Sequence, residues 1–120
     1  NKTKDLVLGY FGASTGAAAA LVAAAEKSDV VKAVVSRGGR PDLANEFLPK
    51  VKAPTLLIVG GFDDVVIEMN QTALSKMRGM KKLEIVPGAT HLFEESDTLE
   101  RVAILAKDWF LKYLERKIKL

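Results

Sequence analysis

The chain has 120 residues, 48% of them hydrophobic, and a formal net charge of +3, which suits one ordinary globular domain. Its lysine and arginine residues are scattered along the sequence, so we expect no nucleic-acid partner. With no cysteine and one histidine, the chain forms no disulfides and gives no reason to expect a metal site. We expect no cofactor, and we expect a cytoplasmic location, with which the absence of cysteine is compatible.

The first elements come from an uncharged segment, residues 6–25, which is long enough to suggest a membrane-spanning helix. Glycines and Ser14 interrupt the middle of this segment, and its second half is nearly all alanine. It divides better into a short apolar strand, Leu6–Phe11, a turn and an alanine-rich helix. We therefore expect no membrane association.

Strand and helix patterns then alternate along the rest of the chain. Short apolar runs predict buried strands, and longer segments with apolar residues at helical spacing predict helices. Asp97 and Glu100 have the spacing of a capping box, which predicts the start of the last helix. The expected strands are 6–11, 30–36, 55–59 and 83–86, and the expected helices are 17–27, 42–47, 66–78 and the segment after Asp97.

This order predicts an α/β fold with a four-stranded parallel sheet flanked by helices. Right-handed crossovers bring the carboxyl ends of parallel strands to one edge of the sheet, where such folds place their functional sites. Polar residues follow each expected strand in turn: Ser14 the first, Arg37 and Arg40 the second, Asp63 and Asp64 the third, and His91 the fourth.

The sequence "GASTG" lies between the first strand and the first helix. Gly-x-Ser-x-Gly in this position is the pattern of a nucleophile elbow, in which a sharp turn projects the serine hydroxyl above the sheet. We expect Gly12 and Gly16 to be required because a side chain at either position would collide. The N–H of Thr15, at the helix N-terminus, is expected to bind an oxyanion.

Four segments, "GYFGASTGAAAALVAAAE", "VVSRGGRPDLA", "APTLLIVGG" and "VPGATHLFEE", resemble the C-terminal half of a dienelactone hydrolase-like α/β-hydrolase. They are similar in particular to serine-bearing members that are found beside or fused to phosphoribosyltransferase-like domains. The resemblance covers nearly the whole chain. It implies a hydrolase that acts on a small-molecule ester, a lactone or a similar acyl bond.

The resemblance also implies roles for three residues. Ser14 would be the nucleophile, His91 the base and Asp63 the acid, because the family pattern places an aspartate after Gly-x-x in "GGFD". Asp64 remains the competing acid. True dienelactone hydrolases use a cysteine nucleophile, whereas this chain has Ser14, so we do not expect dienelactone itself to be the substrate.

Other polar residues have weaker expectations. Arg37 and Arg40 either cap a loop or bind an anionic substrate, because guanidinium groups suit carboxylates and phosphates. Glu94 and Glu95 are expected either to face solvent or to lead into the last helix. A dinucleotide-binding turn is a further alternative, but Ser14 stands where its pattern needs glycine, and Asp63 and His91 would have no role.

A complete α/β-hydrolase has strands before the elbow, and one of their loops supplies a second oxyanion donor. We therefore expect residues 1–120 to be a single partial domain, the C-terminal half of the fold. The strand Leu6–Phe11 would have an open edge, so we expect a homodimer or an N-terminal-half partner to pair with it. The alternative to an enzyme is a non-catalytic fragment that serves as an assembly unit.

Overall fold

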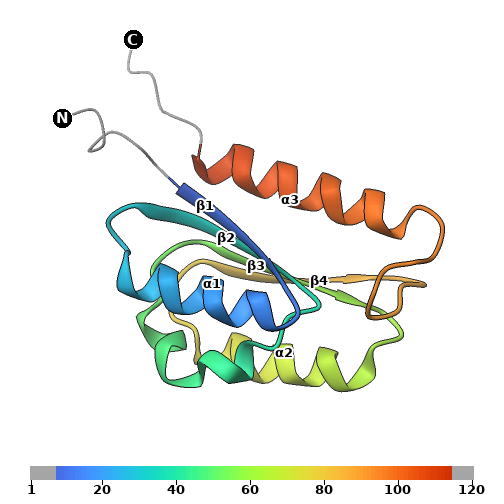
Figure 1. The fold of residues 1–120 in the computed structure, drawn as a ribbon, viewed down its shortest axis with the longest axis horizontal. Helices are drawn as coiled ribbons and strands as arrows, with labels where there is room; N and C mark the ends of the chain where they lie inside the picture. Colours follow the sequence, from blue (N-terminus) through green and yellow to red (C-terminus); the bar gives the residue numbers. More distant parts are fainter. Residues whose placement is uncertain (1–7, 115–120) are drawn as a thin grey trace, which may run out of the picture.

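The computed structural model describes residues 8–114, which form four strands and four helical segments. Strands and helices alternate throughout this part of the chain, as Figure 1 shows. In chain order the elements are β1 (Leu8–Ala13), α1 (Thr15–Glu26), β2 (Val31–Arg37), the 3-10 segment η2 (Pro41–Lys50), β3 (Thr55–Gly60), α2 (Asp64–Lys76), β4 (Lys81–Val86) and α3 (Thr98–Leu114).

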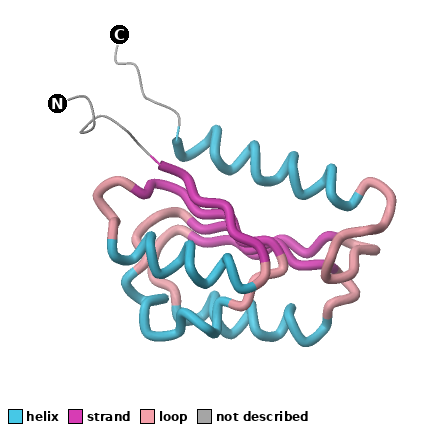
Figure 2. Tube along the Cα trace, viewed as in Figure 1, coloured by secondary structure: helices cyan, strands magenta, loops and turns pink. Residues whose placement is uncertain are grey.

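The four strands form one parallel sheet in the order β1-β2-β3-β4. The sheet separates two helical layers, with α1, η2 and α2 on one face and α3 on the other (Figure 2). The predicted α/β class and parallel sheet are confirmed. All four strands therefore point their carboxyl ends toward the same edge, and the loops that follow them meet there.

Two hydrophobic clusters fill the space between these layers. Alternate residues of β2 enter different clusters: Val34 packs toward α1 and η2, whereas Val35 packs toward α3. This alternation is the ordinary consequence of strand geometry. Trp109 of α3 is buried in the second cluster, and its indole Nε1 donates a hydrogen bond to the carbonyl of Pro54 at 3.1 Å.

Element boundaries differ from the sequence predictions at several points. The first strand extends to Ala13, directly before Ser14, while residues 6 and 7 of the predicted strand lie outside the described residues. The predicted helix 42–47 is a longer 3-10 segment, and the helix predicted over residues 66–78 begins at Asp64 and ends at Lys76. Asp97 has a φ of 68°, so it lacks the extended backbone of an N-cap.

None of the helices within residues 8–114 has both the length and the apolar composition that crossing a bilayer requires.

Candidate active site

Ser14 lies in a strained turn between the end of β1 and the start of α1. Its φ of 51° and ψ of −123° are unusual for a residue with a side chain. Backbone hydrogen bonds hold it on both sides: its N–H donates to the Arg37 carbonyl at 3.1 Å, and its carbonyl accepts from Ala17 N at 3.2 Å and Arg40 N at 3.1 Å. Such strain persists only where the surrounding structure fixes it.

The two glycines of "GASTG" have different surroundings. A Cβ atom on Gly12 would lie 2.6 Å from both Ala17 Cα and the Gly16 carbonyl oxygen, which are backbone atoms that cannot move aside. A Cβ atom on Gly16 would meet no atom within 4 Å of the described structure. The predicted collision is therefore confirmed for Gly12, whereas the prediction for Gly16 is wrong.

His91 and Asp63 continue a hydrogen-bond chain from Ser14. Ser14 Oγ lies 2.9 Å from His91 Nε2, and His91 Nδ1 lies 2.8 Å from Asp63 Oδ2. The Asp63 side chain is 16% exposed, whereas that of His91 is 38% exposed at the edge of the sheet. Asp64 is the first residue of α2 and is exposed, so the structure places Asp63 rather than Asp64 against the imidazole.

The two hydrogen bonds of His91, to Ser14 and to Asp63, select one tautomer of the neutral imidazole. The Asp63 carboxylate only accepts hydrogen bonds, so Nδ1 carries the proton and Nε2 is left to accept from the Ser14 hydroxyl. The lone pair that can remove a proton is thus directed at the serine. The arrangement can perform the nucleophilic chemistry of a Ser-His-Asp triad.

The loop that carries His91 is closed by Glu95. Its carboxylate accepts hydrogen bonds from Thr90 N at 3.0 Å and Thr90 Oγ1 at 2.7 Å. Both bonds hold the pKa of Glu95 below its usual value, and the bond from the Thr90 backbone has the larger effect. The side chain of Phe93 is 2% exposed and anchors the loop in the core. Glu95 was expected to face solvent or to lead into the last helix, and sequence spacing alone gave no signal of its bonds to Thr90.

The two arginines at the end of β2 differ. Arg40 forms a two-bond pair with Asp42, with nitrogen–oxygen distances of 3.0 and 2.9 Å. Arg37 lies with its guanidinium 5.4 Å from the Phe93 ring centre, and its Nη1 donates to the Leu92 carbonyl at 3.5 Å. Among the described residues Arg37 has no carboxylate partner, so its charge is the less compensated of the two.

Thr15 is the first residue of α1. The first N–H groups of a helix have no partner inside the helix, and the helix dipole favours negative charge beside them. Its position directly after Ser14 suits an oxyanion donor. Among residues 8–114, no three His, Asp or Glu side chains are grouped so that they could hold a metal ion.

Residues 1–115 match the dienelactone hydrolase family. The chain belongs to this family. The resemblance expected from the sequence segments is confirmed, and the fold of the described residues agrees with it.

Two relatives of this dienelactone hydrolase family chain share most of its sequence. A Mycobacterium tuberculosis protein named "Putative phosphoribosyl transferase" is 64% identical over 112 residues, which are 93% of this chain and 25% of the relative. The crystal structure of a dienelactone hydrolase from Anabaena variabilis has a TM-score of 0.91 and 61% identity, over 95% of this chain and 53% of that one. The chain thus spans about a quarter and about half of their lengths.

A more distant structure shares the fold. The esterase domain of a Rhodothermus marinus protein has a TM-score of 0.78 and 24% identity, over 89% of this chain and 61% of that one.

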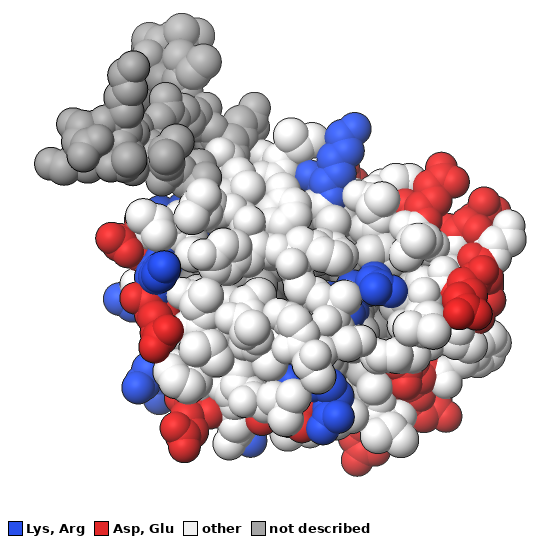
Figure 3. All heavy atoms as spheres, viewed as in Figure 1, with Lys and Arg blue, Asp and Glu red and all other residues white. Residues whose placement is uncertain are grey.

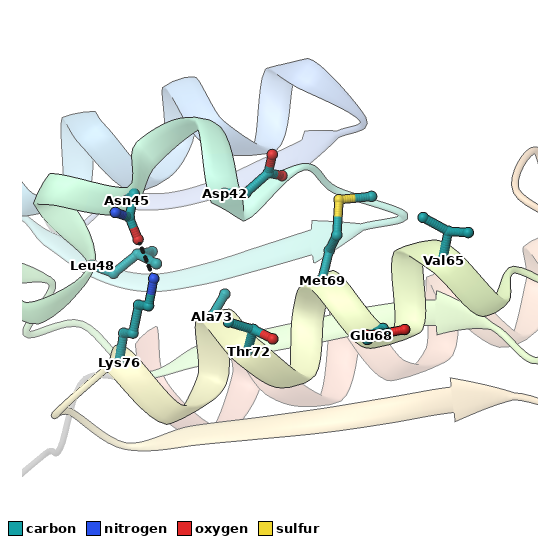
Figure 4. A pocket seen from close by; sticks show the side chains of 9 residues that line it. All are labelled: Asp42, Asn45, Leu48, Val65, Glu68, Met69, Thr72, Ala73 and Lys76. Carbon is teal, nitrogen blue, oxygen red and sulfur yellow. Dashed lines mark hydrogen bonds between the residues drawn. The ribbon is translucent and has the colours of Figure 1, made fainter.

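A cavity of about 300 Å³ lies between η2 and α2, on the helical layer and apart from the triad. Figure 4 shows Leu48, Met69 and Ala73 among its lining side chains, with Lys76 bonded to Asn45 at its rim. None of Ser14, Asp63 and His91 lines this cavity. In this member of the dienelactone hydrolase family, the hydrogen-bonded residues Ser14, His91 and Asp63 therefore lie at the edge of the sheet and not in this cavity.

Proposed function

We propose that the protein is a serine hydrolase that cleaves ester, lactone or similar acyl bonds through a triad of Ser14, His91 and Asp63. The observation that carries the proposal is the continuous chain from Ser14 Oγ to His91 Nε2 at 2.9 Å and from His91 Nδ1 to Asp63 at 2.8 Å. Membership of the dienelactone hydrolase family supports hydrolysis as the reaction class.

In the proposed reaction, His91 Nε2 removes the hydroxyl proton as Ser14 Oγ attacks the carbonyl carbon of the substrate. The carbonyl oxygen becomes negatively charged and accepts a hydrogen bond from Thr15 N–H. The imidazolium then gives its proton to the leaving alkoxide, which leaves an acyl group on Ser14. Water, deprotonated by the same nitrogen, attacks the acyl carbon, and the acid is released as the imidazolium returns its proton to Ser14 Oγ. Asp63 orients the imidazole and stabilises its charged form.

We propose a small-molecule substrate with some apolar character. Leu92 follows His91 and is 59% exposed, and Phe62 precedes Asp63 and is 69% exposed, so apolar side chains flank both triad residues. Arg37 is the better candidate for contact with an anionic group, since Arg40 is occupied by Asp42. A cytoplasmic location is part of the same proposal.

The first test is intact-mass measurement after incubation with a fluorophosphonate. We expect one adduct on the wild-type chain and none on Ser14→Ala or His91→Ala, because labelling requires both the nucleophile and its base. Ser75→Ala is the matched control, because Ser75 is exposed on α2, far along the sequence from the elbow, and its loss should leave the adduct unchanged.

No adduct on a folded wild-type chain would contradict the proposal. It would favour the alternative, a non-catalytic α/β-hydrolase fragment that serves as an assembly unit or needs an N-terminal half.

A further inference from the structure

Asn70 is a fully buried polar residue on α2, outside the proposed triad. Its amide nitrogen Nδ2 donates to the Val66 carbonyl at 2.8 Å and to the Gly39 carbonyl at 3.2 Å. The opposite amide orientation would direct oxygen at two carbonyl oxygens, so these contacts settle which end is nitrogen. The Asn70 side chain thus connects α2 to the loop after β2 by a hydrogen bond.

The bond to Gly39 leads to the elbow through peptide groups. The Gly39 carbonyl and the Arg40 N–H belong to the same planar peptide group, so fixing one fixes the other. Arg40 N–H donates to the Ser14 carbonyl at 3.1 Å. The Ser14 carbonyl in turn shares its peptide group with the Thr15 N–H, which is the proposed oxyanion donor.

The Gly39 peptide has little freedom to move. A Cβ atom on Gly39 would collide with Ser36 Oγ and would lie 2.6 Å from Ala17 Cβ, so this backbone is packed against β2 and α1. On the preceding residue, Gly38 has a φ of 53°, and its N–H donates to the Ile58 carbonyl at 2.7 Å. The loop is therefore bonded to α2, β3 and the elbow at once.

We propose that Asn70 is a positioning residue that orients and polarises the Thr15 N–H through these two peptide groups. The proposal rests on the proposed serine hydrolase function. Each hydrogen bond in such a chain strengthens the next, because donation to a carbonyl increases the positive charge on the N–H of the same peptide. An oxyanion donor stabilises the transition state only if it is held in place before the charge develops.

The structural test is the amide resonance of Thr15 in ¹H–¹⁵N spectra, which does not require turnover. Asn70→Ala removes the donor without adding bulk, so the Ser14 carbonyl should accept a weaker bond and the Thr15 ¹⁵N resonance should move upfield. Asn70→Gln keeps an amide donor and should restore part of the shift. Ala73→Gly is the matched control, since it lowers the helix propensity of α2 and removes a buried methyl group without touching the relay.

The kinetic test compares the same variants with a short ester. We expect kcat and the rate of fluorophosphonate labelling to fall roughly 10-fold in Asn70→Ala, less than the 100- to 1000-fold effect of deleting an oxyanion donor. KM should stay nearly unchanged, because the effect is confined to the transition state. Ala73→Gly should retain both values.

The outcomes separate the two proposals. If the wild-type chain is labelled on Ser14 and Asn70→Ala matches Ala73→Gly in both the Thr15 resonance and kcat, the relay is wrong and the hydrolase stands. If the wild-type chain is not labelled, the hydrolase is wrong, and the Thr15 resonance alone still decides whether the relay exists. Should Asn70→Ala fail to fold, Asn70→Leu fills the space without a donor and takes its place.

Discussion

Asp63 and Asp64 are neighbours in sequence, yet only the Asp63 carboxylate contacts His91, at 2.8 Å. Asp63→Asn would reverse the bond and favour the wrong imidazole tautomer, so we expect kcat to fall on the order of 10⁴-fold, as the same change does in serine proteases. Steady-state hydrolysis of a short ester measures this.

Asp64→Asn is the matched control for Asp63→Asn. It should retain nearly all activity, because Asp64 is exposed at the start of α2. Equal losses in the two variants would contradict the assignment of Asp63 as the acid.

Glu95 gives the loop around His91 a dependence on pH. Thr90 N and Oγ1 both donate to its carboxylate, which lowers the pKa of Glu95 in the folded protein. A lowered folded pKa means that the carboxylate stabilises the fold above its ordinary pKa, and that this contribution is lost as the pH falls through the folded value. Glu95→Gln should therefore melt below the wild-type temperature at neutral pH, and the difference should vanish in acid.

Circular dichroism melts at a series of pH values, from neutral pH down to well below the ordinary pKa of a glutamate, test this difference. Glu94→Gln is the control, because Glu94 is the neighbour of Glu95 in sequence and is exposed. A Glu95→Gln deficit that stays constant down to the lowest pH would show that the carboxylate charge is irrelevant to it.

At the scale of elements, the two glycines at the junction of β1 and α1 have different surroundings, so replacing them should have opposite effects on stability. Gly12→Ala should destabilise the protein by roughly 1–3 kcal/mol, because the new methyl group meets fixed backbone. Gly16→Ala should stabilise it by roughly 0.4–1 kcal/mol, because Gly16 lies in α1 with open space around it. Urea unfolding of the two variants gives both values, and changes of the same sign would contradict this interpretation.

Periodicity predicted which elements exist, because apolar runs and helical spacing are local properties of the sequence. Their ends were less predictable, since the competing ends differ by little local free energy and packing decides between them. Asp97 and Glu100 have capping-box spacing, but the loop from His91 enters α3 with Asp97 at a φ of 68°. The helix nevertheless begins at Thr98, directly after Asp97 as predicted, although Asp97 lacks the backbone of an N-cap.

The faces of α3 show the same limit. Helical spacing predicts burial of Val102 and Ala106, and the structure has both in the core. Leu99, three residues before Val102 and so expected on the same helix face, is 56% exposed, while Trp109 is 8% exposed. Which turns of α3 lie against the sheet depends on how the helix is placed on the assembled sheet, and the helix sequence alone does not determine that placement.

The site was predictable where it rests on strand ends. Ser14, Asp63 and His91 each follow a strand, so a parallel sheet brings them to one edge. The hydrogen bonds of Asn70 and Glu95 were not predictable in this way. They depend on which turn of α2 lies beside the loop after β2, and on the shape of the loop between β4 and α3, neither of which has a sequence period.

At the scale of the whole molecule, β1 is the edge strand of the described sheet. Phe11 is 50% exposed there, and the face that shows β1 nearest the viewer is largely uncharged at its centre (Figure 3). We propose that two copies pair through β1, since an apolar edge strand is a template for another strand. Light scattering should then show a dimer of this chain.

A lysine on the edge should oppose that pairing, so Phe11→Lys is expected to return the chain to a monomer. Leu99→Lys is the control, because Leu99 is similarly exposed, at 56%, but lies at the start of α3. A wild-type monomer well above micromolar concentration would overturn the dimer and favour an N-terminal-half partner on this edge.

Trp109, the chain's only tryptophan, has a consequence for measurement. Its indole donates a hydrogen bond to the carbonyl of Pro54, just before β3. Asp63 lies beyond the other end of this six-residue strand, whose two ends are roughly 20 Å apart at 3.3 Å per residue. Intrinsic fluorescence should therefore change when α3 leaves the sheet and stay nearly silent when an ester occupies the elbow. The fluorescence of Trp109 can therefore be used to follow unfolding, but not to follow binding of the proposed substrate.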